Sequence, residues 1–239
     1  MTCRITFSFF AIYFFILSFL FAQQPQQSHT SSELRLLLKK LSVTGSVLYI
    51  AAHPDDENTR LLSYFANEKL FQANYLSLTR GDGGQNLIGG EQGDLLGIIR
   101  TQELMAARRI DRAYQFFTRA KDFGYSKTSE ETISIWNKDS VLSDLIWIIR
   151  NFKPDLILCR FPPTGEGGHG HHTASAILAQ LAFIASGDST KFRWQLSEVK
   201  LWKAKRLLWN AFIRDNKADL TKFYSLDIGN FNPLLGKSY

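Results

Sequence analysis

The segment that most constrains the fold is the short apolar run SVLYIA at residues 46–51. A run this short, apolar at successive positions, is typical of a strand that is buried on both faces. Similar short runs follow at residues 74–79 and 155–160, and helical patterns lie between them. Strands of this kind that alternate with helices predict an α/β fold, with a mostly parallel sheet covered by helices on both sides.

Helical patterns account for much of the remaining chain. Four leucines recur at i, i+3, i+4 and i+7 in residues 34–41, which predicts a leading helix. Further helices are expected at residues 58–69, 94–118, 140–152 and 171–185. Additional strands are expected at residues 132–136 and 206–213, whereas residues 228–239 end without an evident helix. The length of 239 residues suits one main domain, which we place at residues 46–239.

The first 22 residues differ from the rest in composition. After one arginine, residues 5–22 carry no charge and are rich in phenylalanine, and polar residues follow them. This pattern predicts a signal peptide at residues 1–22, cleaved after Ala22, and an exported protein that is periplasmic or extracellular. An uncleaved membrane anchor is the alternative, because the run approaches the length of a spanning helix. Residues 23–45 then form a linker and the leading helix.

Charge and cysteine content exclude some partners and bonds. Removal of residues 1–22, which hold one arginine, leaves 27 basic residues against 22 acidic ones. The basic residues are scattered rather than massed, so no nucleic-acid partner is expected. Cys159 is then the single cysteine, so no intrachain disulfide can form. Its apolar neighbours favour a small core residue over a reactive thiol.

Four of the five histidines fall into two short segments that each follow a predicted strand. His53 follows the first strand, and His169, His171 and His172 follow the strand at 155–160. The carboxyl ends of parallel strands meet at one edge of a sheet, so both segments should converge there. His53 and His172, together with the carboxylate of Asp56, then form a set of two histidines and one carboxylate. Such a set binds a metal ion and leaves positions open for water.

Two further side chains in these segments are candidates for proton transfer. A zinc-bound water has a pKa near 7, and a base must still accept its proton. Asp55, next to Asp56, is the candidate base, and a helix N-cap is its alternative role. His169 is the candidate group that stabilises the oxyanion or delivers a proton to the leaving amine. Its alternative role is that of a surface-loop histidine.

Four motifs together resemble the PIG-L/LmbE deacetylases. They are AHPDDE at 52–57, TRGDGG at 79–84, RTQEL at 100–104 and HGHH at 169–172, and their order spans about residues 46–185. The resemblance implies a Rossmann-like three-layer α/β/α fold, one zinc ion, and hydrolysis of N-acetyl groups on glucosamine derivatives. It assigns these roles to residues: His53, Asp56 and His172 as metal ligands, Asp55 as base, and His169 as oxyanion partner.

The resemblance also suggests contacts to an amino-sugar substrate. Asp82 matches an acidic substrate contact, Arg100 an arginine that contacts sugar or phosphate, and Asp122 another sugar-binding acid. Each of the three can instead be a cap or a salt-bridge partner. His171 departs from the commoner pattern, in which an aspartate at this position orients the first histidine of the cluster. A secreted branch of the family resembles the form found here, and the role of His171 stays open.

Two other functions are compatible with the sequence. A non-haem iron oxygenase also uses two histidines and one carboxylate, but the α/β alternation and the adjacent Asp55 favour hydrolysis. A carbohydrate-binding or inactive domain of a larger envelope protein is suggested by the abrupt end at Tyr239, which leaves open that the chain is part of a longer protein.

Overall fold

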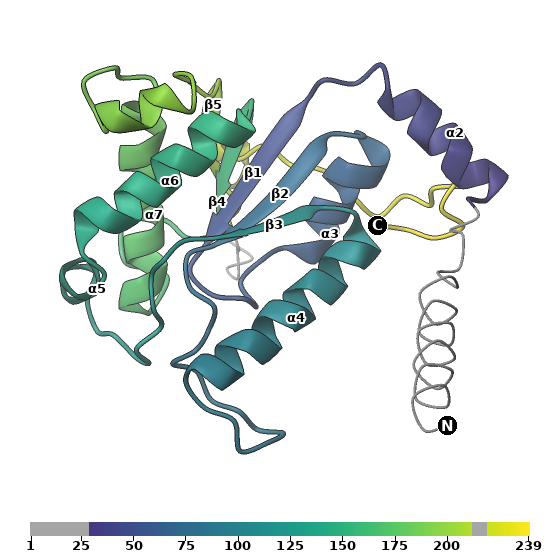
Figure 1. Cartoon of the computed structure of the whole chain (residues 1–239). Coiled ribbons are helices and arrows are strands. Elements are labelled where there is room, and N and C mark those ends of the chain that lie inside the picture. The colour runs from purple at the N-terminus through teal and green to yellow at the C-terminus, as the bar shows by residue number, and fades with distance from the viewer. Residues whose placement is uncertain (1–28, 212–218) are drawn as a thin grey trace, which may run out of the picture.

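The computed structural model describes residues 29–211 and 219–239, and the predicted signal peptide at residues 1–22 lies outside this range. Its centre is a five-stranded sheet, all parallel, in the order β3-β2-β1-β4-β5 (Figure 1). The strands are β1 (Ser46–Ala51), β2 (Gln72–Ser77), β3 (Tyr114–Phe117), β4 (Leu156–Cys159) and β5 (Arg206–Trp209). The predicted α/β fold with a parallel sheet is confirmed.

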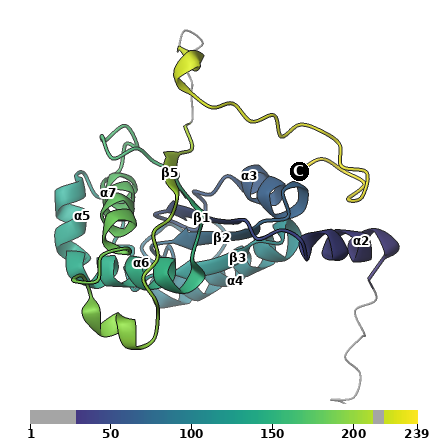
Figure 2. The same ribbon diagram turned by 90° about the horizontal axis from the view of Figure 1, so that it is seen from above.

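Helices cover both faces of the sheet, and Figure 2 shows the layers from above. The α-helices are α2 (Ser31–Lys40), α3 (Thr59–Ser63), α4 (Asp94–Asp111), α5 (Ser129–Ile135), α6 (Lys138–Phe152) and α7 (Gly170–Ala185). Shorter turns of other helix types are η1 (Tyr64–Glu68), which continues α3, η2 (Arg193–Ser197) and η3 (Leu220–Lys222). No helix in these described residues is long and apolar enough to cross a membrane.

The apolar run that forms β1 is buried on both faces. Leu48 and Ile50 pack into a core cluster with α6 and α7, whereas Val47, Tyr49 and Ala51 pack on the other face with α3, η1 and α4. Alternate side chains of one strand therefore supply two separate cores, as a strand between two helical layers must. Cys159 of β4 lies in the first core, and burial raises the pKa of its thiol to about 12, which confirms a core residue.

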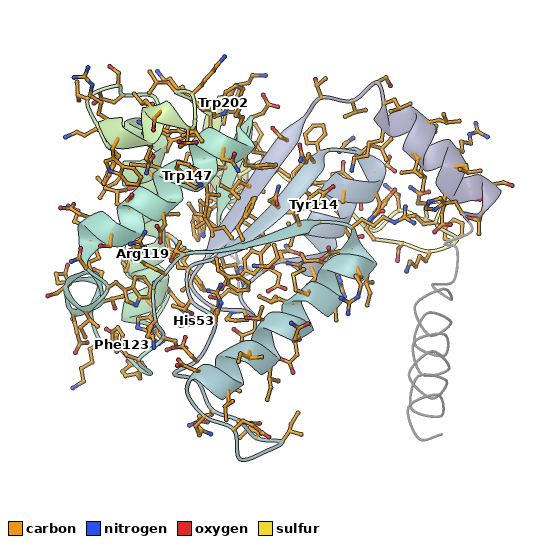
Figure 3. The ribbon with its side chains drawn as sticks, in the orientation of Figure 1. His53, Tyr114, Arg119, Phe123, Trp147 and Trp202 are labelled. Atoms are coloured by element: carbon orange, nitrogen blue, oxygen red, sulfur yellow. The ribbon has the colours of Figure 1, made fainter. Side chains whose placement is uncertain are left out.

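The strand order reverses beside β1, and this reversal positions the site. β1 pairs with β2 on one side and with β4 on the other, with Val47 opposite Leu156 and Ile50 opposite Cys159. The loops after β1 and β4 leave the sheet next to each other, and at such a switch point an open α/β sheet forms a crevice. Figure 3 shows His53 at this end of the strands and Trp202 at the opposite end.

The predicted strand at residues 132–136 is wrong, because these residues belong to helix α5 and its end. The alternation Ile-Ser-Ile resembles a strand pattern, but Thr128 caps a helix by accepting a hydrogen bond from Glu131 N. Acidic residues in the first turn add to this start signal. The helix buries Thr132 and Trp136, four residues apart on one face, and leaves Ile135 56% exposed.

The predicted helix at residues 94–118 is too long, because α4 ends at Asp111. Arg112 adopts a left-handed conformation with φ of 64° and caps the helix, and Asp111 Oδ1 accepts a hydrogen bond from Ala113 N. The aromatic residues that follow then form the edge strand β3, beside β2. Helical spacing continued through this segment in the sequence, but pairing with the sheet edge determined its conformation.

The predicted strand at residues 206–213 is confirmed in part. β5 begins at Arg206 as predicted, while residues 212 and 213 of the predicted strand lie outside the described residues. No α-helix is described after β5, and Asn232 forms an isolated antiparallel bridge with Lys237. The hydroxyl of Tyr239 donates to Glu68, so this segment returns to the η1 region of the domain.

Arg150 of α6 holds the connection between α7 and β5. Its side chain is fully buried and donates hydrogen bonds to backbone carbonyls of five residues and to the side chain of Gln195. The carbonyls belong to Ala185, Ser186, Asp188, Lys191 and Phe192. These acceptors lose their partner if the guanidinium is removed, and each one that is left buried and unsatisfied costs about 1–3 kcal/mol.

We expect Arg150→Met to lower the free energy of unfolding by about 3 kcal/mol or more, because several buried carbonyls lose their donor at once. Arg119→Met is the matched control, since Arg119 is exposed and pairs with Asp144 at the surface. It should cost about 1 kcal/mol or less. Denaturant unfolding of both variants measures the difference, and equal losses would contradict the role given to Arg150.

Candidate active site

The loop after β1 turns two side chains toward each other. His53 N donates a 2.7 Å hydrogen bond to Asp56 Oδ2, and the same carboxylate oxygen lies 3.3 Å from His53 Nδ1. The Tyr75 hydroxyl of β2 donates to the carbonyl oxygen of His53. The N–H and the carbonyl group of the His53 backbone are thus both hydrogen-bonded, and the Asp56 carboxylate faces the His53 ring.

Glu57 anchors the same loop through a buried cluster of charges. Arg108 Nη2 of α4 lies 3.1 Å from Glu57 Oε1 and 2.6 Å from Asp111 Oδ2, and Arg108 is 3% exposed. Burial raises the pKa of Glu57, and the positive charge of Arg108 opposes this rise. Removal of one partner from such a cluster costs about 3–5 kcal/mol, so the cluster holds the loop against α4.

The second histidine segment starts helix α7. His169 is its N-cap, and the ring nitrogen Nδ1 accepts a 3.1 Å hydrogen bond from His171 N. Gly170 N donates to Ser126 O at 2.8 Å, and a Cβ at Gly170 would lie 2.3 Å from the carbonyl oxygen of Thr128. Only glycine allows this approach, which brings the start of α7 against residues 126–128.

His172 is oriented by its backbone and by an aromatic ring. Its Nδ1 lies 2.8 Å from the carbonyl oxygen of Gly167, so Nδ1 carries the proton and donates. Nε2 therefore keeps a lone pair, and it lies 3.5 Å from Asp56 Oδ1. The ring of Phe161 stacks on His172 with a centroid distance of 3.8 Å and an interplanar angle of 5°.

His53, Asp56 and His172 together fit a divalent metal ion. One ligand atom from each lies within 4.8 Å of the others. The carbonyl that fixes the His172 tautomer is the kind of second partner that metal-binding histidines have. Burial lowers the pKa of His53, but its hydrogen bond to Asp56 and nearby carboxylates outweigh this effect and raise it. Burial raises the pKa of Asp56, but the two histidines outweigh this and lower it.

A second group of potential ligands contains His53, His169 and His171. In this group His53 Nε2 and His171 Nδ1 lie 3.0 Å apart, within hydrogen-bonding distance. Nδ1 of His169 already accepts from a backbone N–H. One nitrogen of each ring in this group is therefore already hydrogen-bonded, and the group that contains Asp56 is the better metal site.

His169 and His171 differ in exposure but are both neutral at physiological pH. Burial, with repulsion by neighbouring histidines, lowers the pKa of His169 to about 4 and that of His171 to about 3. Because Nδ1 of His169 accepts a hydrogen bond, the proton of its neutral ring lies on Nε2. His171 is completely buried and packs edge-on against Phe123 at 4.4 Å.

The turn at residues 81–84 supports the loop that carries Asp122. Asp82 Oδ1 accepts a 3.2 Å hydrogen bond from Asp122 N, and a Cβ at Gly83 would lie 2.4 Å from the Asp122 carbonyl oxygen. Gly81 has φ of +68°, and an added Cβ there would lie 2.5 Å from the Arg100 guanidinium. Gly83 therefore allows the Asp122 loop to approach this turn closely, and Gly81 allows the Arg100 side chain to do so.

Asp55 lies at the mouth of the site rather than at its floor. Its side chain is 72% exposed, and Oδ2 forms a 3.1 Å ion pair with Arg100 Nη2. Asp55 is thus an exposed residue of the same cavity, whereas the adjacent Asp56 is largely buried. The two carboxylates have different partners: Asp56 faces histidines, and Asp55 faces an arginine.

These side chains line a cavity of about 1160 Å³. Seven of the eight predicted site residues line it: His53, Asp55, Asp56, Arg100, Asp122, His169 and His172. Asp82 does not line this cavity but a separate one of about 370 Å³, and its Oδ1 accepts the hydrogen bond from Asp122 N. The wall also contains Leu87, Ile88 and Tyr125, which no motif includes, and Glu103, which lies in the RTQEL motif but was assigned no role.

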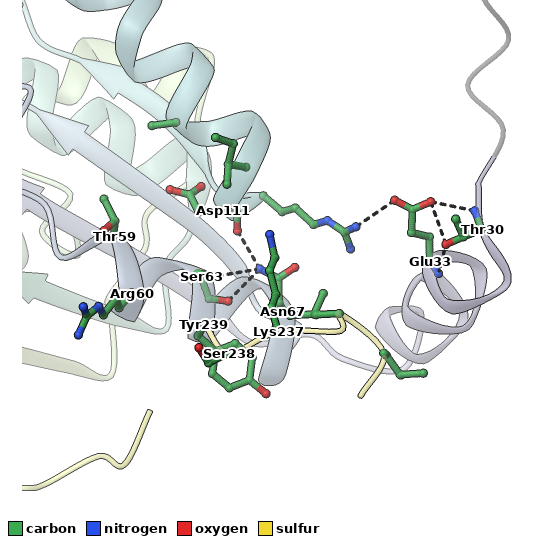
Figure 4. Close-up of a pocket in the computed structure, with 15 residues that line it drawn as sticks. Thr30, Glu33, Thr59, Arg60, Ser63, Asn67, Asp111, Lys237, Ser238 and Tyr239 are labelled. Atoms are coloured by element: carbon green, nitrogen blue, oxygen red, sulfur yellow. Dashed lines mark hydrogen bonds and ion pairs between the residues drawn. The ribbon is translucent and has the colours of Figure 1, made fainter. Parts of the chain in front are cut away.

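Another cavity, of about 540 Å³, lies near the other end of α4, among α2, α3 and the C-terminal segment (Figure 4). Its polar groups largely satisfy one another. Glu33 pairs with Arg112, and the amide nitrogen of Asn67 donates to Ser63 and to the backbone of Asp111. No histidine lines this cavity, so the histidine-lined cavity is the candidate active site.

The fold and the site define an α/β protein with a histidine and carboxylate cavity at the carboxyl edge of a parallel sheet. A family model described as PIG-L, GlcNAc-PI de-N-acetylase, matches residues 48–183, which is more than half of the chain. The chain therefore belongs to the PIG-L family. The matched region contains all the predicted site residues.

Individual relatives are distant. A 1D-myo-inositol 2-acetamido-2-deoxy-alpha-D-glucopyranoside deacetylase of Mycobacterium leprae is 24% identical over 192 residues, which are 72% of this chain and 61% of the relative. The chain thus spans about three fifths of the length of the curated relatives it matches.

Two solved structures share the fold at 18% identity. An N,N'-diacetylchitobiose deacetylase from Pyrococcus horikoshii has a TM-score of 0.56, with 77% of this chain and 70% of that chain covered. A 4-carboxy-2-hydroxymuconate hydratase from Pseudomonas putida has a TM-score of 0.50, with 69% and 64% covered. Because a hydratase shares the fold, the fold alone does not define the reaction.

We expect Gly170→Ala to destabilise the protein by about 1–3 kcal/mol, because the new methyl group overlaps the Thr128 carbonyl and forces the start of α7 to shift. Gly90→Ala is the control, since no atom lies within 4 Å of a Cβ built there. Thermal unfolding compares the two variants. A Gly170→Ala protein as stable as the Gly90→Ala protein would show that the close approach is not required.

Proposed function

We propose that this protein is a zinc-dependent deacetylase that hydrolyses the N-acetyl group of an N-acetylglucosamine-type substrate. The observation that carries the proposal is the convergence of His53, Asp56 and His172 within one cavity that also contains Asp55 and His169. Membership of the PIG-L family supports this reaction class, and the deacetylases among its relatives support an amino-sugar substrate.

Zinc is the proposed ion because the donors are two imidazoles and one carboxylate, which leave positions open. When bound, zinc would lower the pKa of a coordinated water toward about 7 and polarise the amide carbonyl. The protein contributes the fixed orientation of the ligands. Gly167 holds the tautomer of His172, and the loop anchored by Glu57 holds His53 and Asp56.

Asp55 is the proposed general base. Its carboxylate can accept the proton of the water that attacks the amide carbon, and it can then return this proton to the leaving nitrogen. The ion pair with Arg100 restricts the position of the carboxylate at the mouth of the cavity. The amide C–N bond breaks in the second step, so the products are acetate and the free amine of the sugar.

His169 is the proposed donor to the oxyanion. Its N-cap hydrogen bond leaves the ring proton on Nε2, and the ring lines the cavity. A neutral imidazole N–H can donate a hydrogen bond to the carbonyl oxygen as negative charge develops there. With a pKa of about 4, His169 stays neutral above that pH, and a hydrogen-bond donor fits this state better than a proton donor.

Arg100 and Asp122 are proposed to contact the sugar, together with Glu103 and Tyr125 of the same cavity wall. Polar and aromatic groups of this kind can bind hydroxyls and stack on a sugar ring. For Asp82, a direct contact with substrate stays a prediction, because its carboxylate is occupied by the backbone of Asp122. We further propose that the chain is exported, on the evidence of its N-terminal apolar run.

The first test concerns the metal. The unsubstituted protein should bind about one zinc per chain, and His53→Ala and His172→Ala should each lose it, because each removes one of three protein ligands. His29→Ala is the matched control, since His29 is exposed and lies outside the cavity. Zinc content after dialysis is the measurement. Stoichiometric zinc in both cavity variants would exclude this site, and oxygen consumption by an iron-loaded protein would instead support an oxygenase.

The second test separates chemistry from metal binding. Asp55→Asn keeps the shape of the side chain but cannot accept a proton, so acetate release should fall by about 10²- to 10⁴-fold. Zinc content should not change, because Asp55 is not a proposed ligand. Asp56→Ala is the comparison variant, and it should lose zinc.

Acetate release from N-acetylated sugars and zinc content are measured on the same protein samples. Activity near that of the unsubstituted protein in zinc-loaded Asp55→Asn would contradict the assigned base. Loss of zinc in that variant, with zinc retained in Asp56→Ala, would mean that the two carboxylates have exchanged roles.

A further inference from the structure

His171 lies behind the proposed metal ligand His53, away from the cavity. Its side chain is completely buried and does not line the cavity. Nδ1 of His171 lies 3.0 Å from Nε2 of His53. A hydrogen bond between two ring nitrogens needs a proton on one of them and a lone pair on the other. If Nε2 of His53 carries the proton, Nδ1 of His171 must therefore be the acceptor.

The geometry of His53 determines which ring donates. Its Nδ1 faces Asp56 at 3.3 Å, on the side of the proposed metal position. A metal ion takes the lone pair of Nδ1, so the ring proton must then lie on Nε2. Nδ1 of His171 is the nearest acceptor for that proton, because the closest Asp122 oxygen lies 3.9 Å away, beyond hydrogen-bonding distance.

The surroundings of His171 suit an acceptor at Nδ1. With Nδ1 as acceptor, the proton of the neutral ring lies on Nε2, which has no hydrogen-bond partner among the described residues. The ring packs against Phe123 and Trp136 at centroid distances of 4.4 and 4.8 Å, and such aromatic rings can accept a weak hydrogen bond from an N–H group. Backbone contacts at the start of α7 keep the ring in place. Asp122 Oδ1 lies 3.8 Å from His171 Nδ1, and its negative charge favours a proton on the nearby Nε2 of His53.

We propose that His171 is a positioning residue that accepts the Nε2 proton of His53 and so directs the lone pair of His53 Nδ1 toward the metal ion. This inference rests on the proposed function, because it requires a metal ion at His53. Groups that orient a metal-binding histidine in this way affect metal affinity by about 10- to 100-fold. His171 itself contacts neither the metal position nor the substrate cavity.

Two substitutions of His171 distinguish a hydrogen-bond acceptor from a side chain that only packs in the core. In His171→Asn, the side-chain oxygen can occupy the position of Nδ1 and accept the same proton. In His171→Leu, a side chain of similar size offers no acceptor. We expect zinc to bind about 10- to 100-fold more weakly to His171→Leu, whereas His171→Asn should bind it within a few-fold of the unsubstituted protein.

Zinc affinity is measured by competition with a chromophoric chelator, and thermal unfolding checks that each variant is folded. The ring resonances of His53 in the zinc-loaded, ¹⁵N-labelled protein give a second readout. The proton on Nε2 should be detected, and its chemical shift should move in His171→Leu but not in His171→Asn. If His171→Leu does not fold, His171→Gln replaces it, because its acceptor lies farther along the side chain.

Equal zinc affinity in the unsubstituted, Asn and Leu proteins would overturn the positioning role and leave the proposed function intact. Equal weakening in Asn and Leu would also overturn it, because a merely structural role predicts no rescue by an acceptor. Failure of the unsubstituted protein to bind zinc would overturn the proposed function, and this inference with it. The predicted order, with Asn close to the unsubstituted protein and Leu weaker, supports the inference.

Discussion

The parallel pairing of β1 with β4 is the constraint on which the rest of the site depends. It places the loop that carries His53 and Asp56 beside the connection that leads to α7 and His172, although more than 110 residues separate these segments. Because alternate side chains of β1 belong to two different cores, a one-residue shift of its register would place each of them in the opposite core. The position of the site is therefore fixed by the burial of the core.

Buried charges add to this constraint where apolar packing ends. Arg108 joins the end of α4 to the loop after β1, and Arg150 joins the end of α6 to the chain after α7. Both guanidinium groups are nearly or fully buried and bonded to several oxygen atoms. Such buried charges add less to stability than the number of their hydrogen bonds suggests, because removing the charge from water costs free energy that offsets the attraction. Their main effect is to favour one arrangement of the loops.

The sequence predicted the parallel sheet and most of its helices because the apolar runs of β1, β2 and β4 are short and clearly bounded. It did not predict β3 or α5, where a sheet edge and a helix cap overrode the local pattern. Motifs identified seven of the eight proposed site residues, including Asp55 and Asp56. They could not show that Glu57 pairs with Arg108 or that His171 lies behind His53, because such contacts depend on tertiary packing.

The arrangement of protons around Asp56 links the folded structure to metal binding. Burial lowers the pKa of His53, but its hydrogen bond to Asp56 and the nearby carboxylates outweigh this effect and raise the pKa above its ordinary value. A cation that binds between His53, Asp56 and His172 competes with a proton for Nδ1 of His53, because a metal ligand has to offer a lone pair. Metal binding therefore becomes weaker as the pH falls below the pKa of His53. Nε2 of His53 lies on the other side of the ring, so its hydrogen bond with His171 can persist in both states.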